Sequence, residues 1–287
     1  MNSKNNNLYI FYLIRLNPRI LIGAIIIVGF VLCAMLAPYV SPYDPIKIDL
    51  RAKYEVPTAR HLLGTDYIGR DVFSRLIWGT RVSLLTAVMA ISIAAIIGLL
   101  LGVSAGYFGG MTDTLISRFI DIMLALPAFI MAIVLMGVLG RGTPNMILAI
   151  GVGMSPRIAR VVRGATLKIK ENEFVEAAKT FGYGDWRIIF RHIIPHCVTP
   201  LVVYSTLLLG SAVMLEAGLS FLGLGISPPT PSWGLMITEG TDVMRTLPWI
   251  VSTAGLCIVI LVLGFNLLGD GLRDHLDPRL RGEITQE

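Results

Sequence analysis

Long runs without a charged side chain dominate the hydrophobic and polar pattern of this 287-residue chain. A helix needs about 20 largely apolar residues to cross a hydrocarbon core about 30 Å thick. Six runs are compatible with such spans, and the shortest reaches the required length when Arg157 and Arg160 extend their charged ends to the interface. The pattern therefore predicts an all-α integral membrane protein with six transmembrane helices. They cover approximately residues 20–41, 83–106, 115–139, 144–162, 197–217 and 247–269.

A seventh uncharged run, residues 217–238, is interpreted as a turning loop and not as a span. It contains Pro228 and Pro229, and a proline-interrupted backbone exposed to lipid would leave polar groups without hydrogen bonds. With this loop set aside, the chain divides into three predicted parts. These are residues 1–82 with the first transmembrane helix and an outer loop, a core of residues 83–282 with the other five predicted transmembrane helices, and a tail of residues 283–287.

Composition and charge agree with a multi-pass membrane protein. Hydrophobic residues make up 54% of the chain and charged residues only 15%, whereas a soluble domain carries about 25% charged residues. An even number of spans puts both termini on one side. A cytoplasmic location for both termini places fifteen of the 24 basic residues inside, as the positive-inside rule favours.

Two other compositional features carry little functional information. The net charge of +5 requires no nucleic-acid partner. Cys33, Cys197 and Cys257 all fall in predicted spans without metal or redox spacing, so we interpret them as small core residues and expect no metal site.

The link between the fourth and fifth predicted spans, residues 164–195, contains two short predicted helices. The first covers residues 168–181, and Gly182 suits the turn that ends it. Asp185 is placed to cap the second, residues 185–192. Two short helices joined by a glycine turn would project from the membrane and offer a surface to a partner.

The same link carries a specific spacing of residue types. Glu176-Ala177-Ala178 is followed after three residues by Gly182, and further on Pro195 closes a hydrophobic-proline pair. This spacing resembles the EAA loop of ABC importer permeases. In that family the loop forms a coupling helix in a cleft of the cytoplasmic ATPase, and it transmits ATP-driven closure of the ATPase dimer to the membrane helices. The resemblance assigns this coupling to Glu173, Glu176, Ala177, Ala178, Lys179, Gly182, Asp185, Arg187 and Pro195.

Three further stretches narrow the resemblance. Residues 61–75, 220–234 and 266–279 look like signatures of the second, C-type permease of dipeptide, oligopeptide and nickel importers. The resemblance runs from about residue 10 to residue 282. It implies a type I ABC importer permease fold in a bacterial cell membrane, with four kinds of partner. These are a second related permease in a heterodimer, two ATPase chains that bind ATP and Mg, an external solute-binding protein, and membrane lipid.

The stretch before the second predicted span also has a chemical interpretation. Asp66, Arg70, Asp71, Arg75 and Arg81 lie close together in the sequence and predict a buried or interfacial ion-pair network. A catalytic interpretation of His61, Asp66 and Ser74, which are nucleophile-triad residue types, is disfavoured because no activated-serine elbow accompanies them.

The proline-rich loop 217–238 has two open interpretations. Pro228, Pro229 and Trp233 form a candidate contact for the external binding protein, and simple subunit packing is the alternative.

Within the spans, three glycines and two acids are the informative residues. Gly98, Gly102 and Gly106 recur every four residues and predict close approach of another helix. Ionisable groups in spans cost about 2.5–3.5 kcal/mol on insertion scales, so the acids need partners or a role. We expect Asp121 to pair with Arg118 at an interface. Glu216 and Asp121 are both candidates for the translocation path or for contact with the partner permease.

The absence of a Gly-x-x-x-x-Gly-Lys-[Ser/Thr] loop means that this chain is not itself the ATPase, and we expect it to bind no cofactor. The favoured function is a permease subunit for dipeptides and oligopeptides. The same role for nickel or metal chelates is the alternative. A self-sufficient secondary transporter is disfavoured because no inverted repeat appears, and an intramembrane enzyme because no catalytic pair lies in the spans.

Overall fold

A computed structural model describes residues 18–276, and over this range the chain is helical without a strand. Five stretches are long and apolar enough to cross a membrane, and a bent helix pair makes six if its two helices count as one span. The predicted all-α membrane fold is confirmed, and five or six spans agree with the six predicted. The five are α2 (Pro18–Val40), α3 (Val72–Phe108), α6 (Thr143–Lys170), the continuous stretch Asp185–Phe221 that contains α9 (Ile194–Phe221), and α11 (Pro248–Leu276).

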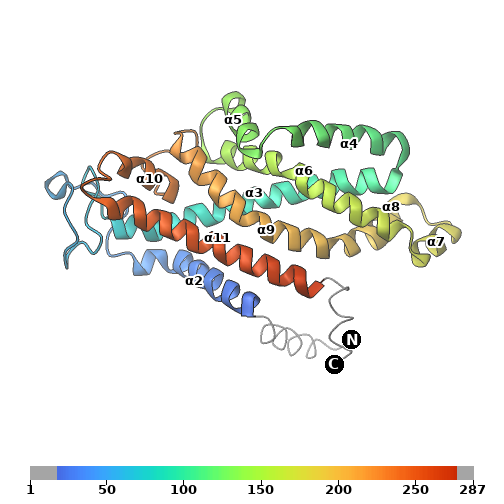
Figure 1. Cartoon of the computed structure of the whole chain (residues 1–287), viewed down its shortest axis with the longest axis horizontal. Helices are drawn as coiled ribbons and strands as arrows, with labels where there is room; N and C mark the ends of the chain where they lie inside the picture. The colour runs from blue at the N-terminus through green and yellow to red at the C-terminus, as the bar shows by residue number, and fades with distance from the viewer. Residues whose placement is uncertain (1–17, 277–287) are drawn as a thin grey trace. The chain divides into compact units, whose positions relative to one another are not determined.

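The third predicted span, residues 115–139, is not one straight helix. It consists of α4 (Gly110–Ala125) and α5 (Ala128–Leu139), which meet at 94° (Figure 1). Pro127 explains the break because the residue before a proline is driven out of the helical region. Leu126 accordingly has φ −97° and ψ 135°.

The first helix predicted in the EAA loop, residues 168–181, is wrong as a single element. Its first residues belong to the end of α6, and a separate helix α7 (Glu173–Thr180) follows. Asn172 separates the two, and its side-chain amide donates to the carbonyls of Lys168 and Ile169 at 3.4 and 3.1 Å. These carbonyls at the end of α6 lack helical partners, so the amide caps α6 and lets the chain turn.

The second loop helix is not a separate element either. α8 (Asp185–Ile188) runs through a π-helix, η2 (Ile189–Ile193), directly into α9. Pro195 is the second residue of α9 and has no N–H for the carbonyl of Arg191 four residues earlier, which the wider π-turn just before it accommodates. The fifth span therefore begins well before the predicted residue 197.

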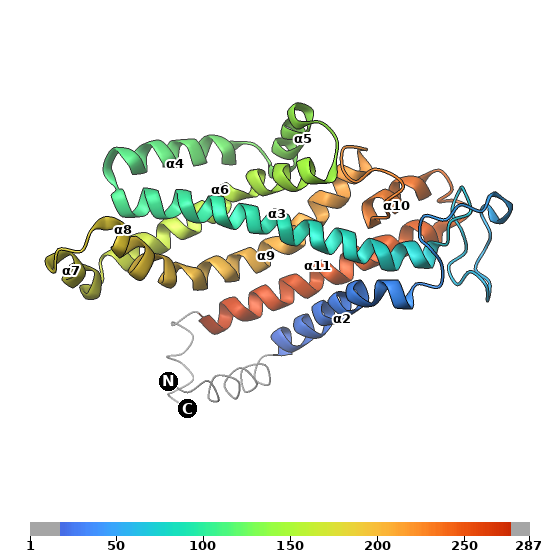
Figure 2. The same cartoon turned by 180° about the vertical axis from the view of Figure 1, so that it is seen from behind.

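The described residues divide into two compact units, and the three parts predicted from the sequence stay a prediction. One unit holds residues up to Leu85 together with those from Leu209 onward, and the other holds Thr86–Leu208. In the first unit α2 runs along α11 (Figure 2). A Cβ added at Gly23 would lie 2.6 Å from the backbone nitrogen of Leu268, so the two helices touch at this glycine.

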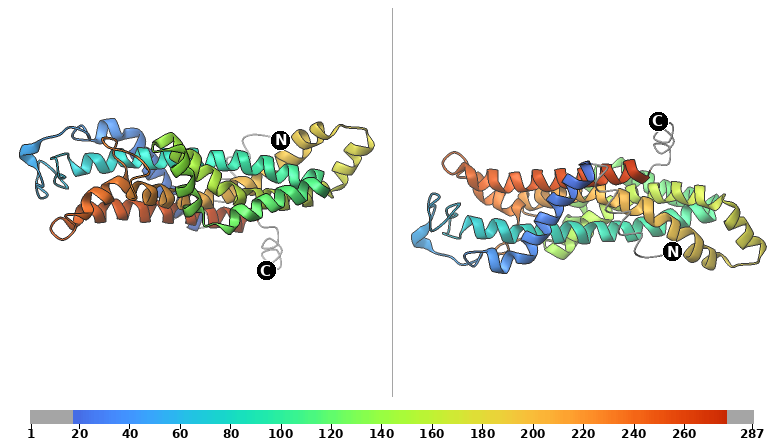
Figure 3. Two further views of the ribbon diagram at one scale, coloured as in Figure 1. Left: turned by 90° about the horizontal axis from the view of Figure 1, so that it is seen from above. Right: turned by 90° about the horizontal axis from the view of Figure 1, so that it is seen from below.

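The second unit confirms the predicted packing of the glycine face on α3. A Cβ added at Gly98, Gly102 or Gly106 would lie 2.6–2.7 Å from atoms of α6. Only glycine permits this approach. Figure 3 shows that the part of the EAA loop between α6 and α9 projects beyond the ends of these two helices.

The run 217–238 contains no span. It holds the end of α9, a loop, and part of the short helix α10 (Trp233–Thr241), which packs on α11. The predicted cytoplasmic location of the termini rests partly on Lys4, Arg15, Arg279 and Arg281. These residues and the tail 283–287 lie outside the described range, so this orientation stays a prediction.

Candidate functional site

The EAA loop owes its shape to the turn after α7. Gly182 has φ 76°, a left-handed conformation that favours glycine. The N–H of Tyr183 donates to the carbonyl of Ala178 at 3.1 Å, and the N–H of Gly182 donates to the carbonyl of Lys179 at 2.9 Å. This pair of bonds is the Schellman motif, so the predicted role of Gly182 at the helix end is confirmed.

Two faces of α7 have different surroundings. Val175 and Ala178 are buried, at 0% and 5% exposure, so Ala178 is part of the inner face and not of the surface open to a partner. Glu173, Glu176, Ala177 and Lys179 are exposed on the outer face. The outer face therefore presents charge around the small side chain of Ala177.

A set of exposed aromatic side chains extends this surface, and sequence reasoning missed it. Phe181 is 79% exposed, Trp186 69% and Phe190 63%. The rings of Trp186 and Phe190 stack with centroids 6.1 Å apart. Exposed apolar groups in a loop mark an interaction surface. The residue types were visible in the sequence, but their exposure was not, because it depends on how α8 lies against the membrane helices.

Asp185 does not have the predicted capping role. Gly184 occupies the N-cap of α8, with no side-chain hydrogen bond there, and Asp185 is the first helical residue. Its carboxylate accepts a hydrogen bond from the Tyr107 hydroxyl at 2.8 Å. Arg187, on the same helix, lies over the Tyr183 ring at 4.1 Å.

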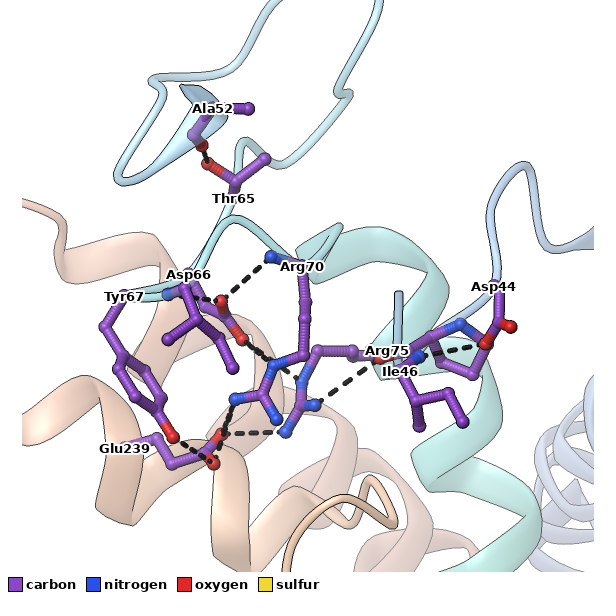
Figure 4. Close-up of polar contacts among 11 residues, drawn as sticks. Asp44, Ile46, Ala52, Thr65, Asp66, Tyr67, Arg70, Arg75 and Glu239 are labelled. Atoms are coloured by element: carbon purple, nitrogen blue, oxygen red, sulfur yellow. Dashed lines mark hydrogen bonds and ion pairs between the residues drawn. The ribbon is translucent and has the colours of Figure 1, made fainter. Parts of the chain in front are cut away.

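A second group of functional interest, shown in Figure 4, joins the connection between α2 and α3 to the first turn of α3 and to α10. Asp66 accepts from Arg70 Nε at 2.5 Å. Glu239 of α10 accepts from Arg70 Nη2 at 3.0 Å and from Arg75 Nη2 at 2.7 Å. The two arginine side chains are only 2% and 1% exposed. The predicted ion-pair network is therefore confirmed for Asp66, Arg70 and Arg75.

Glu239 is the member that the sequence did not predict. The sequence nevertheless indicated that a further acid was needed. The predicted cluster has more basic than acidic side chains, and buried charges need partners. Burial raises the pKa of Tyr67, and Glu239, which accepts from its hydroxyl at 3.3 Å, adds to this rise. Burial acts to lower the pKa of Arg70, but Asp66 and Glu239 outweigh it and the pKa is raised. Both groups are thus held in their protonated forms.

The remaining members of the predicted cluster have other partners. Asp71 accepts from the Ser74 hydroxyl at 2.7 Å and contacts His61 Nδ1 at 2.8 Å. The serine hydroxyl thus donates to the carboxylate and not to the imidazole, so these residues do not form a nucleophile triad. Arg81 lies over the Trp78 ring at 5.8 Å.

Glu216 lies inside the chain, which contradicts the hypothesis that it faces the translocation path or a partner permease. It is 0% exposed. Its carboxylate accepts from Ser83 of α3 and from Ser220 of α9, both at 2.9 Å. The Ser220 hydroxyl in turn accepts from the N–H of Ile226 at 3.2 Å. Glu216 therefore holds one end of the loop between α9 and α10.

The predicted binding-protein contacts in that loop differ in exposure. Pro228 and Pro229 are exposed, whereas Trp233 is 0% exposed. The Trp233 indole N–H donates to the carbonyl of Leu76 at 3.1 Å, and its ring meets Phe30 edge-on at 5.6 Å. Trp233 is therefore a packing residue, and its predicted contact with a binding protein is wrong.

Asp121 forms an ion pair, but not with the predicted partner. It pairs with Arg160 of α6 instead of Arg118. Nearby, Asp113 of α4 accepts from Arg163 at 2.5 and 2.6 Å in a two-bond arrangement. Both pairs join α4 to α6. Among residues 18–274, no group of three or more His, Cys, Asp or Glu side chains forms a possible metal site.

The sequence of the chain matches known protein families. Residues 98–282 match the family described as binding-protein-dependent transport system inner membrane component. The chain belongs to this family. Residues 11–57 match the N-terminal TM domain of oligopeptide transport permease C, which agrees with the C-type subunit inferred from the sequence.

Relatives in the family are similar over nearly their full length. The dipeptide transport system permease protein DppC of Alkalihalophilus pseudofirmus is 40% identical over 94% of this chain and 89% of its own length. The glutathione transport system permease protein GsiD of Pectobacterium atrosepticum is 41% identical over 86% of this chain and 83% of its own. A solved structure of the MetNI methionine ABC transporter in inward-facing conformations matches with a TM-score of 0.58 and 22% identity. It covers 71% of this chain and 97% of that chain.

At 22% identity the solved transporter supports the fold alone, and this fold is that of type I ABC importer permeases. The permease is thus a multi-pass subunit of an ABC importer in the bacterial inner membrane, and it is not itself an enzyme. Hydrolysis of ATP belongs to partner ATPases, and a binding protein delivers the substrate in this family.

Proposed function

We propose that this permease forms half of a translocation pathway for dipeptides and oligopeptides. The other half is a second, related permease in a heterodimer. Two ATPase subunits bind ATP and Mg, and the permease itself binds no cofactor. The names of the 40–41% identical relatives support peptides as the substrate class.

The observation that carries this proposal is the outer face of α7. It is held by the left-handed turn at Gly182 and is bordered by the exposed rings of Phe181 and Trp186. We assign this face to the contact with an ATPase. An ATPase groove that closes on the outer face of α7 would displace α7. Because the chain is continuous on either side, α6 and α9 would move with it.

On the far side of the membrane, the loop between α9 and α10 is the proposed contact for the binding protein. Its exposed tip contains Pro228 and Pro229. Its two ends are fixed by buried groups, Glu216 through Ser220 at one end and Trp233 at the other. A proline-rich tip on fixed ends is preorganised for docking, which reduces the entropy lost on binding.

The test reverses one charge on the outer face of α7. In the complete importer, Glu176→Lys should reduce ATP-dependent uptake of radiolabelled dialanine about tenfold or more, because a charge-assisted contact is worth about 1.5–3 kcal/mol. Glu171→Lys is the matched control. Glu171 is exposed and follows the end of α6, outside α7, so uptake should stay within about twofold of the wild type.

A second variant tests the turn. Gly182→Val places a β-branched residue at φ 76°, which costs about 1–2 kcal/mol or more and reorients the end of α7. We expect the chain to reach the membrane in normal amount, measured by immunoblot, while co-purification of the ATPases falls. Normal uptake and normal ATPase binding in both Glu176→Lys and Gly182→Val would contradict the assigned role of the EAA loop.

A further inference from the structure

Tyr107 connects the end of α3 to the EAA loop. It lies in the last turn of α3, and it is only 4% exposed. Its hydroxyl donates to Asp185 Oδ1 at 2.8 Å. Its backbone carbonyl accepts from Lys170 Nζ at 2.6 Å, and the same ammonium group lies 5.8 Å from the ring centroid.

These contacts join three elements that the chain connects in different ways. Lys170 is the last residue of α6 and Asp185 the first residue of α8. The EAA loop is continuous with α6 on one side and with α9 on the other, so any displacement of the loop reaches both through covalent bonds. α3 ends at Phe108, far from the loop in sequence. It receives such a displacement only through side-chain contacts and packing.

The end of α3 is packed closely enough on its neighbours that a displacement at Tyr107 would move the helix end with it. A Cβ added at Gly106 would lie 2.7 Å from the Thr166 Cβ, so α3 is packed closely on α6 one residue before Tyr107. Gly109 then turns the chain with φ 67°. The carbonyls of the last helical turn have no helical partners, and Lys170 satisfies that of Tyr107.

We propose that Tyr107 is a positioning residue for energy coupling, which carries the motion of the EAA loop to α3 through its hydrogen bond to Asp185. This inference rests on the proposed function of the loop as the receiver of ATPase motion. Without the hydrogen bond from Tyr107 to Asp185, α8 can still move α9 through the continuous chain, but the motion of α3 is no longer coupled to that of α8. The expected defect is therefore loss of transport per ATP hydrolysed, and not loss of ATPase binding.

The experiment uses the complete importer in lipid vesicles with its binding protein and radiolabelled dialanine as the probe. Tyr107→Phe removes only the hydroxyl, and we expect dialanine imported per ATP hydrolysed to fall about tenfold. Tyr43→Phe is the matched control, because it removes a tyrosine hydrogen bond to the Arg60 carbonyl of 2.9 Å in the connection between α2 and α3. Its ratio should equal that of the wild type.

A double-mutant cycle separates the relay from a general loss of structure. Asp185→Ala should lower the ratio as Tyr107→Phe does. The double variant should be no worse than either single variant, because both remove one interaction. Asp185→Asn keeps a carbonyl acceptor for the hydroxyl and should give a smaller loss than Asp185→Ala.

The failure of this relay differs from the failure of the proposed function. A wild-type ratio in Tyr107→Phe, or additive losses in the double variant, would overturn the relay while Glu176→Lys still reduced uptake. Normal uptake in Glu176→Lys would overturn the role of the loop itself. Co-purified ATPase should stay at the wild-type amount in Tyr107→Phe, and its loss would also overturn the relay, since the defect would then lie in docking.

Discussion

At the scale of single residues, Glu216 shows how burial changes the role of an acid in a span. The sequence suggested a group at a path or an interface, but the carboxylate is enclosed and accepts from Ser83 and Ser220. An enclosed acceptor of this kind joins α3, α9 and the loop that follows α9. Removal of the Glu216 carboxylate leaves the two buried serine hydroxyls without an acceptor, and each unsatisfied hydroxyl costs about 1–3 kcal/mol.

Glu216→Leu should therefore lower the apparent melting temperature of the purified chain by several degrees, since about 2 kcal/mol corresponds to several degrees in a protein of this size. Glu216→Gln keeps an oxygen acceptor and should lose less. Both can be measured by fluorescence-detected unfolding in detergent. A Leu variant as stable as the wild type would show that the serine bonds contribute nothing to stability.

At the scale of helices, the glycine face of α3 decides how closely α6 approaches. In Gly102→Ala, the new Cβ would lie 2.6 Å from the Ala159 carbonyl oxygen, a backbone atom that cannot move without shifting α6. Overpacking of this kind costs about 1–3 kcal/mol. We expect a lower melting temperature and weaker ATP-dependent uptake from Gly102→Ala.

Gly164→Ala, in α6, is the matched control for that substitution. A Cβ added at Gly164 would have no atom within 4 Å. Alanine is favoured over glycine in a helix interior by about 0.5–1 kcal/mol, so the melting temperature should stay equal or rise slightly. If both alanine variants behaved alike, the close approach of α3 and α6 would not be the cause.

At the scale of the whole molecule, the energy source separates a permease subunit from a self-sufficient transporter. The chain has no phosphate-binding loop of its own, and it belongs to a family that works with ATPase partners. Vesicles that hold only the two permease chains should not accumulate radiolabelled dialanine under an ion or proton gradient. Vesicles with the complete importer should accumulate it when ATP is present.

Accumulation without ATPases would contradict this prediction. The same vesicles distinguish the two substrate classes suggested by the sequence. Excess unlabelled dipeptides should compete with dialanine, whereas a nickel chelate should not. Competition by the chelate alone would assign the importer to metals.

Much of the fold could be predicted from the sequence, because the features that determine it are local. Hydrophobic length defined the spans, four-residue spacing of Gly98, Gly102 and Gly106 defined a packing face, and Gly182 ended α7. Errors at this level came from single residues with local geometric effects. Pro127 bends the third span, and Asn172 separates α6 from α7.

Only the tertiary structure decided which distant side chains meet. Arg75 and Glu239 are 164 positions apart, and Tyr107 and Asp185 are 78 apart. The sequence showed that these groups were charged or polar and needed partners, because unpaired buried groups are costly. It did not identify the partners, since pairing depends on which helices pack together and in what register. For the same reason the sequence located the EAA loop, whereas the packing of α3 against α6 and the hydrogen bond from Tyr107 to Asp185 decided how that loop is joined to the membrane helices.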